Sequence, residues 1–247
     1  MTLWEIALIA LAFALILIFT IAGKRLGNFR LRKIAAFSAL RNKIELSVED
    51  GTKVHVSLGV GNLLGPQSAA AFAGLNLLRE LSNQASDSDQ PPFASSGDGS
   101  LTLLAQDSLR RNYETMNIGE EFDNRQAQVA GLTVIPYSAA MLPIILDNEA
   151  STHIFAGRFG PGAGLITSAK DGAENFIFAG SDALSGQALF YAGANEALIG
   201  EELYAAGAYL GAGAAHVASL RTQDVLRTLS GLIILGLALG QLIGVFN

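Results

Sequence analysis

The sequence predicts an α/β fold: a mainly parallel sheet with helices on both faces, a Rossmann-like three-layer sandwich, flanked by N- and C-terminal transmembrane helices. The first observation behind this prediction is a pair of uncharged apolar runs near the two ends, at residues 6–22 and 229–246. The second is that short β-rich runs alternate with longer helix-like runs between them. Such alternation with short connections is typical of a parallel sheet covered by helices.

The first apolar run predicts a transmembrane anchor over residues 1–23, because roughly 17 apolar residues can cross a hydrocarbon core of about 30 Å. A basic segment, residues 24–43, follows and contains no acid; its cations are Lys24, Arg25, Arg30, Arg32, Lys33, Arg41 and Lys43. Loops rich in Lys and Arg stay in the cytoplasm, so we expect the N-terminus outside and this segment inside. A cleaved secretory signal would instead carry its basic residues before the apolar run.

The last part of the chain, residues 214–247, predicts a helix that continues from the cytoplasm into a C-terminal transmembrane anchor. Arg221 and Arg227 precede its apolar run, and only Asn247 follows it, so the C-terminus is also expected outside. The predicted location is therefore the cell inner (cytoplasmic) membrane, with the lipid bilayer as a partner and the main domain, residues 44–213, facing the cytoplasm.

The basic segment has two interpretations. Ile34, Phe37, Leu40 and Ile44 recur at three- and four-residue spacing, which predicts a short helix lying in the membrane interface. A plain positively charged flank that stops transfer of the first anchor explains the same cations.

The charge of the main domain excludes some functions. Residues 44–220 contain 20 acidic and 7 basic side chains, a net charge of about −13, so we expect no nucleic-acid partner. The chain has no cysteine, which excludes disulfides and thiolate sites.

The elements of the main domain follow in order. Runs at 43–48 and 53–58 flank a turn sequence at 49–52 and predict a hairpin or two adjacent strands. A helix is expected over 67–85, a polar loop over 86–92, a strand over 93–96 and an amphipathic helix over 101–116. Further strands are expected at 126–131, 152–157 and 175–180, and helices at 137–148, 162–171, 195–210 and 214–246.

The loops after these strands share glycines and capping residues. In a parallel α/β sheet such loops meet at one edge, where ligands usually bind. The candidate ligand-binding residues are Gly59, Gly61, Asp98, Ser100, Arg158 and Asp182. Ordinary turns and helix caps explain the same residues, with Asp98, Ser100 and Asp182 as N-caps. Arg158 favours an anion site, and its alternative role is a salt bridge to Asp182 or another carboxylate.

No motif in the chain names a reaction. Gly59, Gly61 and Gly65 match the dinucleotide fingerprint only in part. His55 and His153 fall singly in predicted strands, where a sheet surface or a satisfied core is expected. The sequence shows no nucleophile elbow, Walker loop or metal-binding His pair, and we expect no metal site and no cofactor.

Three glycines in the second anchor predict close helix packing. Gly236, Gly240 and Gly244 repeat every four residues and place glycine along one helix face, so that another backbone can approach. The partner helix is either the first anchor of the same chain or the anchor of another subunit.

Four runs carry a resemblance to a known family: HVSLGVG (55–61), LLAQDSLRRNYE (103–114), AGRFGPGAGLI (156–166) and LIGEELYAAGAYLG (198–211). Lying between two membrane spans, they resemble an uncharacterised prokaryotic membrane-protein family known only as a domain of unknown function. The resemblance covers the chain from Ile44 to the C-terminus and implies one cytoplasmic domain with terminal anchors. It implies no activity and no catalytic residues.

Two functions from different classes follow. The first is a membrane-anchored, non-catalytic assembly or scaffold module that is homo-oligomeric. The alternative is a membrane-tethered enzyme or sensor that binds a small anionic ligand, such as a nucleotide or phosphate, at the carboxyl edge of the strands. The absence of a legible acid/base or nucleophile constellation favours the first.

Overall fold

The computed structural model describes residues 3–26, 31–65, 67–84, 90–147, 149–172 and 175–242. It divides into two compact units. We call residues 33–211 the body, and the unit of residues 1–32 and 212–247 the helical pair. The helices are α1 (Leu3–Leu26), α2 (Ala35–Glu49), α3 (Ser68–Gln84), α4 (Gly99–Thr115), α5 (Val134–Leu146), α6 (Ala163–Ser168), α7 (Leu184–Gly193), α8 (Glu202–Leu210) and α9 (Ala214–Leu242). The strands are β1 (Lys53–Gly59), β2 (Phe93–Ser96), β3 (Ala127–Val129), β4 (Ala150–Arg158), β5 (Phe176–Ser181) and β6 (Glu196–Leu198), and short 3₁₀ turns lie at Gly119–Glu121, Asn124–Gln126 and Ala169–Gly172.

The six strands of the body form a parallel sheet in the order β3-β2-β1-β4-β5-β6. This is the order of doubly wound dinucleotide-binding folds, in which the chain reverses its direction of travel between β1 and β4. The predicted α/β fold with a parallel sheet is therefore confirmed.

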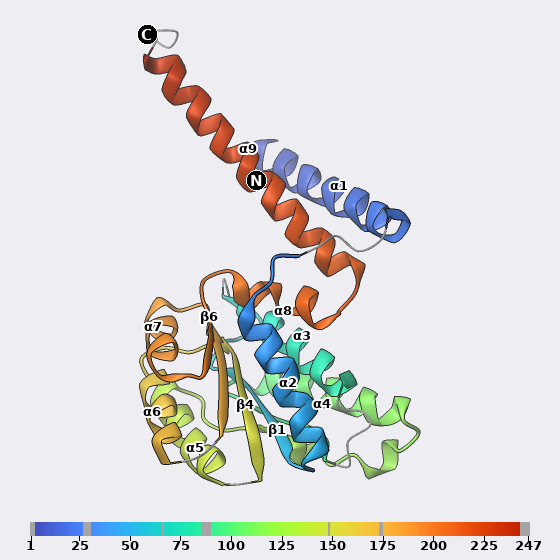
Figure 1. Cartoon of the computed structure of the whole chain (residues 1–247), viewed down its shortest axis with the longest axis vertical. Coiled ribbons are helices and arrows are strands. Elements are labelled where there is room, and N and C mark those ends of the chain that lie inside the picture. Colours follow the sequence, from blue (N-terminus) through green and yellow to red (C-terminus); the bar gives the residue numbers. More distant parts are fainter. Residues whose placement is uncertain are drawn as a thin grey trace. The chain divides into compact units, whose positions relative to one another are not determined.

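Helices cover both faces of the sheet, as Figure 1 shows. One apolar core joins the sheet to α2, α3, α4 and α8, and a second joins it to α5, α6 and α7. The central strands are consequently buried on both faces: β1 directs Val54, Val56 and Leu58 into the first core and His55 and Ser57 into the second layer. Continuous burial of this kind is typical of a parallel strand.

Helix α2 corrects two predictions. The run 43–48 is not a strand, because it forms the second half of α2. The predicted helix with Phe37, Leu40 and Ile44 on one face exists, but these side chains are buried in the core of the body rather than presented to a membrane interface. The Phe37 ring stacks on Tyr209 with centroids 4.7 Å apart, and it also meets Phe178 of β5. The body therefore begins at Lys33.

The region after β5 corrects a third prediction. Residues 195–210 do not form one helix, because Glu196–Leu198 is the edge strand β6 and only Glu202–Leu210 is helical. Helix α7, between β5 and β6, has no counterpart in the sequence-based prediction. The other predicted strands and helices of the body are confirmed to within a few residues, and residues 86–89 of the predicted polar loop lie outside the described part of the chain.

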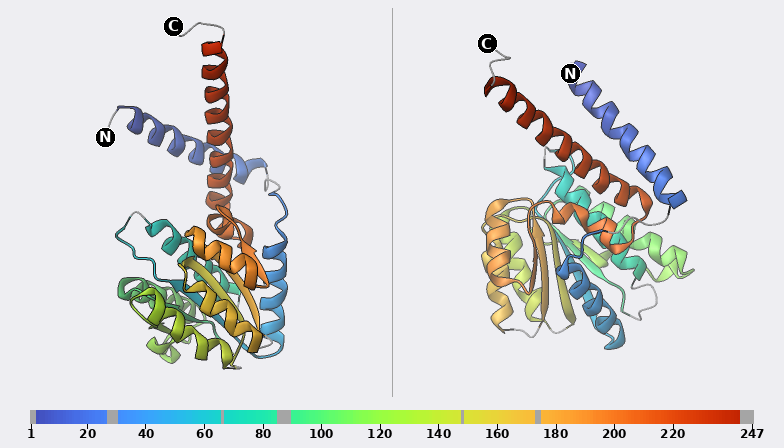
Figure 2. Two further views of the ribbon diagram at one scale, coloured as in Figure 1. Left: turned by 90° about the vertical axis from the view of Figure 1, so that its left-hand side faces the viewer. Right: turned by 45° about the horizontal axis from the view of Figure 1, so that its top comes forward.

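The helical pair contains two helices that are long and apolar enough to cross a membrane, over Leu3–Gly23 and Ala214–Leu239. They contact one another, and Phe19 of α1 lines a shared hollow with Val225 and Leu232 of α9. Figure 2 shows that α1 meets α9 along only part of its length. A Cβ atom at Gly236 would meet no atom within 4 Å, so α1 does not cover this glycine. Gly244 lies outside the described residues.

Candidate functional site

The strand order reverses between β1 and β4, and at this point the structure brings together three of the predicted site residues, Gly59, Gly61 and Arg158. Gly59 has a φ of +71°, and a Cβ atom there would lie 2.3 Å from the carbonyl oxygen of Arg158. The N–H of Val60 donates to that same oxygen over 3.0 Å, and a Cβ atom at Gly61 would lie 3.4 Å from the Cβ of Arg158. The glycines thus permit the ends of two strands to approach each other.

The Arg158 side chain pairs with Asp182 across the end of β5. The Arg158 Nη1 donates to Asp182 Oδ2 over 2.9 Å, and 31% of the arginine side chain and 11% of the aspartate side chain are exposed. The salt bridge to Asp182, which the sequence left open as an alternative, is confirmed. The other carboxylate oxygen, Asp182 Oδ1, is buried and accepts no hydrogen bond from the described residues. Burial raises the pKa of the neighbouring Tyr204, and the charge of Asp182 raises it further.

Asp98 and Ser100 follow β2 and begin helix α4. Asp98 is the N-cap residue: its Oδ1 accepts from the Leu101 N–H over 2.9 Å and from the Ser100 hydroxyl. These hydrogen bonds, above all that from Ser100, lower the pKa of the Asp98 carboxyl. For Asp98, the interpretation as a helix N-cap is therefore confirmed. Ser100 lies inside α4, and the N-cap of α7 is Ala183 rather than Asp182, so these two residues are not caps.

The loop after β1 departs from the dinucleotide fingerprint. In that fingerprint the glycine loop opens directly into a helix whose N-terminus holds the pyrophosphate. Here α3 begins only at Ser68, several residues beyond Gly61. The glycine spacing therefore lacks the structural context that would identify a dinucleotide site.

A polar network lies inside the body, between the sheet and α5. His55 and His153 are register partners on β1 and β4, and their Nδ1 atoms are 3.3 Å apart. His55 Nε2 lies 2.9 Å from the Ser95 hydroxyl, which is 3.2 Å from the Tyr137 hydroxyl, which is in turn 2.7 Å from the Ser57 hydroxyl. The histidines therefore occupy a satisfied core position, one of the two interpretations of the sequence.

The amide of Asn175 fixes the tautomers of both histidines. Its nitrogen donates to the carbonyl oxygen of Ile145 over 2.6 Å, so the second N–H of the same nitrogen donates to His153 Nε2, 3.2 Å away. His153 must then carry its proton on Nδ1 and donate it to His55 Nδ1, which leaves the His55 proton on Nε2 for the Ser95 hydroxyl. Both rings are neutral in this arrangement.

Burial explains why these rings stay neutral. It holds the pKa of His55 well below its usual range, with a further decrease from the adjacent His153. It lowers the pKa of His153 to about 4 and raises the pKa of Tyr137. A Ser next to a His is the arrangement that activates a serine nucleophile. Ser95, however, is only 3% exposed, so a substrate does not reach its hydroxyl in this conformation.

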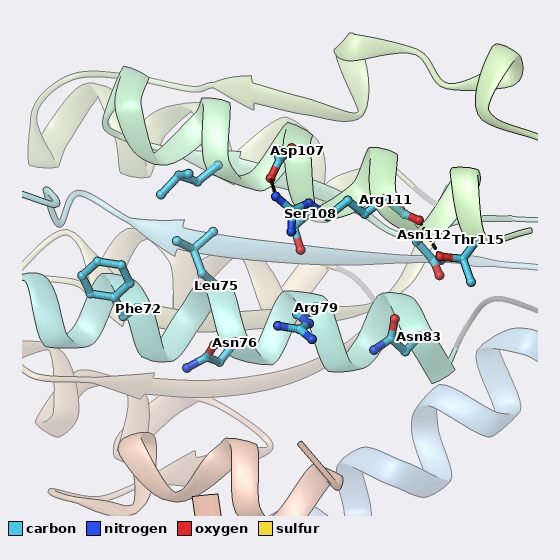
Figure 3. Close-up of a pocket in the computed structure, with 11 residues that line it drawn as sticks. Phe72, Leu75, Asn76, Arg79, Asn83, Asp107, Ser108, Arg111, Asn112 and Thr115 are labelled. Atoms are coloured by element: carbon cyan, nitrogen blue, oxygen red, sulfur yellow. Dashed lines mark hydrogen bonds and ion pairs between the residues drawn. The ribbon is translucent and has the colours of Figure 1, made fainter. Parts of the chain in front are cut away.

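A groove of about 420 Å³ between α3 and α4 is the third candidate, shown in Figure 3. Arg79 and Asn83 of α3 face Asp107, Ser108 and Arg111 of α4 across it. Arg111 Nη2 pairs with Asp107 Oδ2 over 2.9 Å within α4. The groove thus offers polar surface: Asp107 neutralises Arg111, whereas Arg79 forms no ion pair with the described residues. Among the described residues, no three His, Asp or Glu side chains lie close enough together to hold a metal ion.

Sequence reasoning missed the Ser95, Tyr137 and Asn175 members of the buried network. The alternation of His55 and Ser57 with Val54, Val56 and Leu58 was the available sign that β1 directs polar groups into one layer.

Comparisons with known proteins identify the family of the chain. No curated protein and no solved structure matches the chain significantly. A family model described as a domain of unknown function, DUF6754, matches residues 1–246. The chain therefore belongs to the DUF6754 family, as the runs at 55–61, 103–114, 156–166 and 198–211 led us to expect of an uncharacterised family.

Proposed function

We propose that this chain is a membrane-anchored assembly or scaffold module, non-catalytic and homo-oligomeric, held in the inner membrane with its body in the cytoplasm. The observation that carries the proposal is that the charged candidates at the carboxyl edge are engaged within the chain. Arg158 pairs with Asp182, and Asp98 caps its own helix. Side chains that already interact within the chain stabilise the fold and are not available to bind a substrate.

The anchoring part of the proposal rests on the helical pair and the basic segment. Two helices have the length and composition of membrane spans, and seven cations follow the first of them without an acid. The distribution of cations favours a cytoplasmic body. Residues 44–220, with a net charge of about −13, also suit a location away from the anionic inner leaflet, to which the basic segment attaches them.

The assembly part rests on the glycine face of α9. Gly236 is not covered by α1, so within the described part of the chain nothing uses the close approach that this glycine allows. We therefore favour packing against another subunit. The test is the particle mass in mild detergent, by native mass spectrometry, of the double variant Gly236→Leu with Gly240→Leu. We expect a smaller particle than the wild type, because leucine side chains on this face keep the partner backbone at a distance.

The matched control for that test is Gly231→Leu. A Cβ atom at Gly231 also meets nothing within 4 Å, and the residue lies on a different side of α9 from Gly236. We expect this variant to keep the wild-type mass. An unchanged mass for the double variant would mean that the glycine face meets lipid and would contradict the assembly.

The second candidate function is binding of a small anionic ligand at the carboxyl edge, and the strand order favours it. Ligands of doubly wound sheets bind where the strand order reverses, which here is between Gly59 and Arg158. The Arg158 guanidinium is partly exposed, so its remaining N–H groups can donate to an anion. The test is a thermal-shift screen of the wild type and Arg158→Ala with nucleotides, sugar phosphates and divalent ions.

The two functions predict different results in that screen. A ligand site predicts stabilisation by one class of anion that Arg158→Ala weakens by roughly 1.5–3 kcal/mol, the value of a charge-assisted hydrogen bond. The scaffold predicts no ligand effect and a less stable Arg158→Ala protein, because Asp182 loses its partner while mostly buried. Arg125→Ala is the control, since its pair with Asp123 is exposed and contributes little.

A further inference from the structure

In one of the two helical layers of the body, the helices themselves carry no charge, and the 3₁₀ turn after α6 adds Lys170 and Asp171. The segments that contain these helices, residues 130–146, 159–169 and 183–195, contain no Asp, Glu, Lys or Arg. Figure 1 shows α5, α6 and α7 together on one face of the sheet, and α6 contacts both of its neighbours. Every helix of the opposite layer contains at least one charged residue, and α4 alone contains Asp107, Arg110, Arg111 and Glu114. Water-facing helices of a soluble domain normally carry charges.

Apolar side chains point outward from this layer. Leu184 is 81% exposed, Tyr191 74% and Ile135 61%, and Leu146 and Leu165 are also exposed. Between them lie small exposed residues, Ala139 on α5 and Ala188 and Ala192 on α7. We call these outward side chains the α5–α7 face. Exposed apolar side chains on three neighbouring helices without charge favour an interface, because monomeric proteins rarely expose large apolar patches.

We propose that the α5–α7 face is the surface on which a second copy of this chain packs. This inference rests on the proposed homo-oligomeric function and names the surface that the bodies use. The rest of the body is strongly acidic, so two copies repel one another wherever charged surfaces meet. The α5–α7 face is where that repulsion is least.

The chemistry of the face also favours a protein over a lipid surface. Surfaces that lie on a bilayer combine apolar residues with Lys and Arg that meet anionic headgroups. Helices α5, α6 and α7 contain no cation, and Lys170 in the turn after α6 is a single one rather than a row. The alanines of the face allow the backbones of two helices to come close. Helices α5, α6 and α7 have 13, 6 and 10 residues. At about 1.5 Å per residue and about 10 Å between axes, they present about 440 Å². A standard interface buries about 800 Å² on each partner, which the glycine face of α9 would supplement.

The test is to place a charge at the centre of the face. Leu165 lies on α6, the middle helix, and is 39% exposed, so Leu165→Glu should not disturb the core. We expect the full-length variant in mild detergent to associate at least about tenfold more weakly than the wild type in light-scattering mass measurements, since it buries an unpaired charge at the interface. Leu103→Glu on α4, in the opposite layer and 66% exposed, is the matched control and should keep the wild-type mass.

A second measurement identifies what covers the face. The chain has no cysteine, so Leu165→Cys can carry a single environment-sensitive fluorophore in nanodiscs made with brominated lipids. We expect the label to be shielded from aqueous iodide and not quenched by bromine. Quenching by brominated lipid would show that the bilayer covers the face, and free quenching by iodide would show that nothing does. Either result overturns the proposal.

Failure of this inference is distinguishable from failure of the proposed function. A monomeric wild type would contradict both. An oligomer that Leu165→Glu leaves intact, but that Gly236→Leu with Gly240→Leu dissociates, would contradict only the role of the α5–α7 face. Thermal unfolding of each variant shows that a change of mass is not a loss of fold.

Discussion

Gly59 determines how closely β1 and β4 can meet at their carboxyl ends. Its φ of +71° is strained for any residue with a Cβ atom, and that atom would lie 2.3 Å from the carbonyl oxygen of Arg158. We expect Gly59→Ala to lower the free energy of unfolding by at least about 2 kcal/mol, through backbone strain and the forced separation of the strands. Urea unfolding of the full chain in detergent measures it.

Gly99 provides the control for that substitution. It is the first residue of α4, and a Cβ atom there would meet nothing within 4 Å. Gly99→Ala should therefore change the stability by less than about 1 kcal/mol. If Gly59→Ala were equally harmless, the strand ends would not be held as closely as the structure shows.

The buried histidines predict that the body is sensitive to acid. The pKa of His153 falls to about 4 in the folded protein, and that of His55 is well below the usual 6.5. The unfolded chain therefore binds protons that the folded chain excludes. The stability is fully present above about pH 6.5 and is lost as the pH falls below it, by up to about 1.4 kcal/mol per pH unit for each histidine.

Urea unfolding between pH 7 and pH 4.5 measures this slope. His153→Gln removes one of the two titrating groups and should flatten the slope relative to the wild type. An acid slope that His153→Gln does not change would contradict the neutral, buried pair.

Sequence reasoning reached some of these residues and not others, for a physical reason. Arg158 and Asp182 follow strands, so their meeting at one edge could be anticipated as a salt bridge. The contact between His55 and His153 depends on the register of β1 against β4, which joins segments nearly one hundred residues apart. No local pattern specifies that register, and the buried network was therefore not predicted.

At the scale of the elements, α2 shows how burial decides between two local patterns. The run 44–48 has the alternation of a strand, whereas Phe37, Leu40 and Ile44 have the spacing of a helix. The helix forms because that spacing lets all three side chains enter the core against β5 and α8. Strand β6 was missed because its three residues stand at the start of the Ala- and Leu-rich run 195–210, which has the composition of a single helix. Strand β2, by contrast, was predicted with the bounds that the structure has.

The position of α2 gives a prediction that separates a core helix from a membrane-interface helix. Phe37 is 4% exposed and packs against Phe178 and Tyr209, so Phe37→Ala should lower the free energy of unfolding by about 3–5 kcal/mol. Leu46→Ala, on the same helix but 44% exposed, should cost less than about 1 kcal/mol. Urea unfolding in detergent, without lipid, compares them. A stable Phe37→Ala protein that binds anionic vesicles less well would restore the interfacial interpretation.

At the scale of the whole molecule, the sequence predicts the class of fold better than its topology. Alternating strands and helices indicate a parallel sheet, but the order β3-β2-β1-β4-β5-β6 depends on which distant strands pair. The side of the membrane on which each end of the chain lies depends on a simpler quantity, the distribution of cations around two apolar runs. Membrane orientation can therefore be predicted from the sequence even where the function cannot.

The orientation is testable because the chain contains no cysteine. We expect a single cysteine at Thr2 or Asn247 to react with a membrane-impermeant maleimide in intact cells whose outer surface is accessible. A cysteine at Ile118, an exposed residue of the body, should react only after the inner membrane is permeabilised. The reason is that moving the seven cations of residues 24–43 outward across the membrane is strongly disfavoured, whereas the chain beyond each span has almost no charge to retain it inside.

Reaction of Asn247→Cys only after permeabilisation would contradict the two-span arrangement. Reaction of Ile118→Cys in intact cells would place the body outside and reverse the assigned orientation.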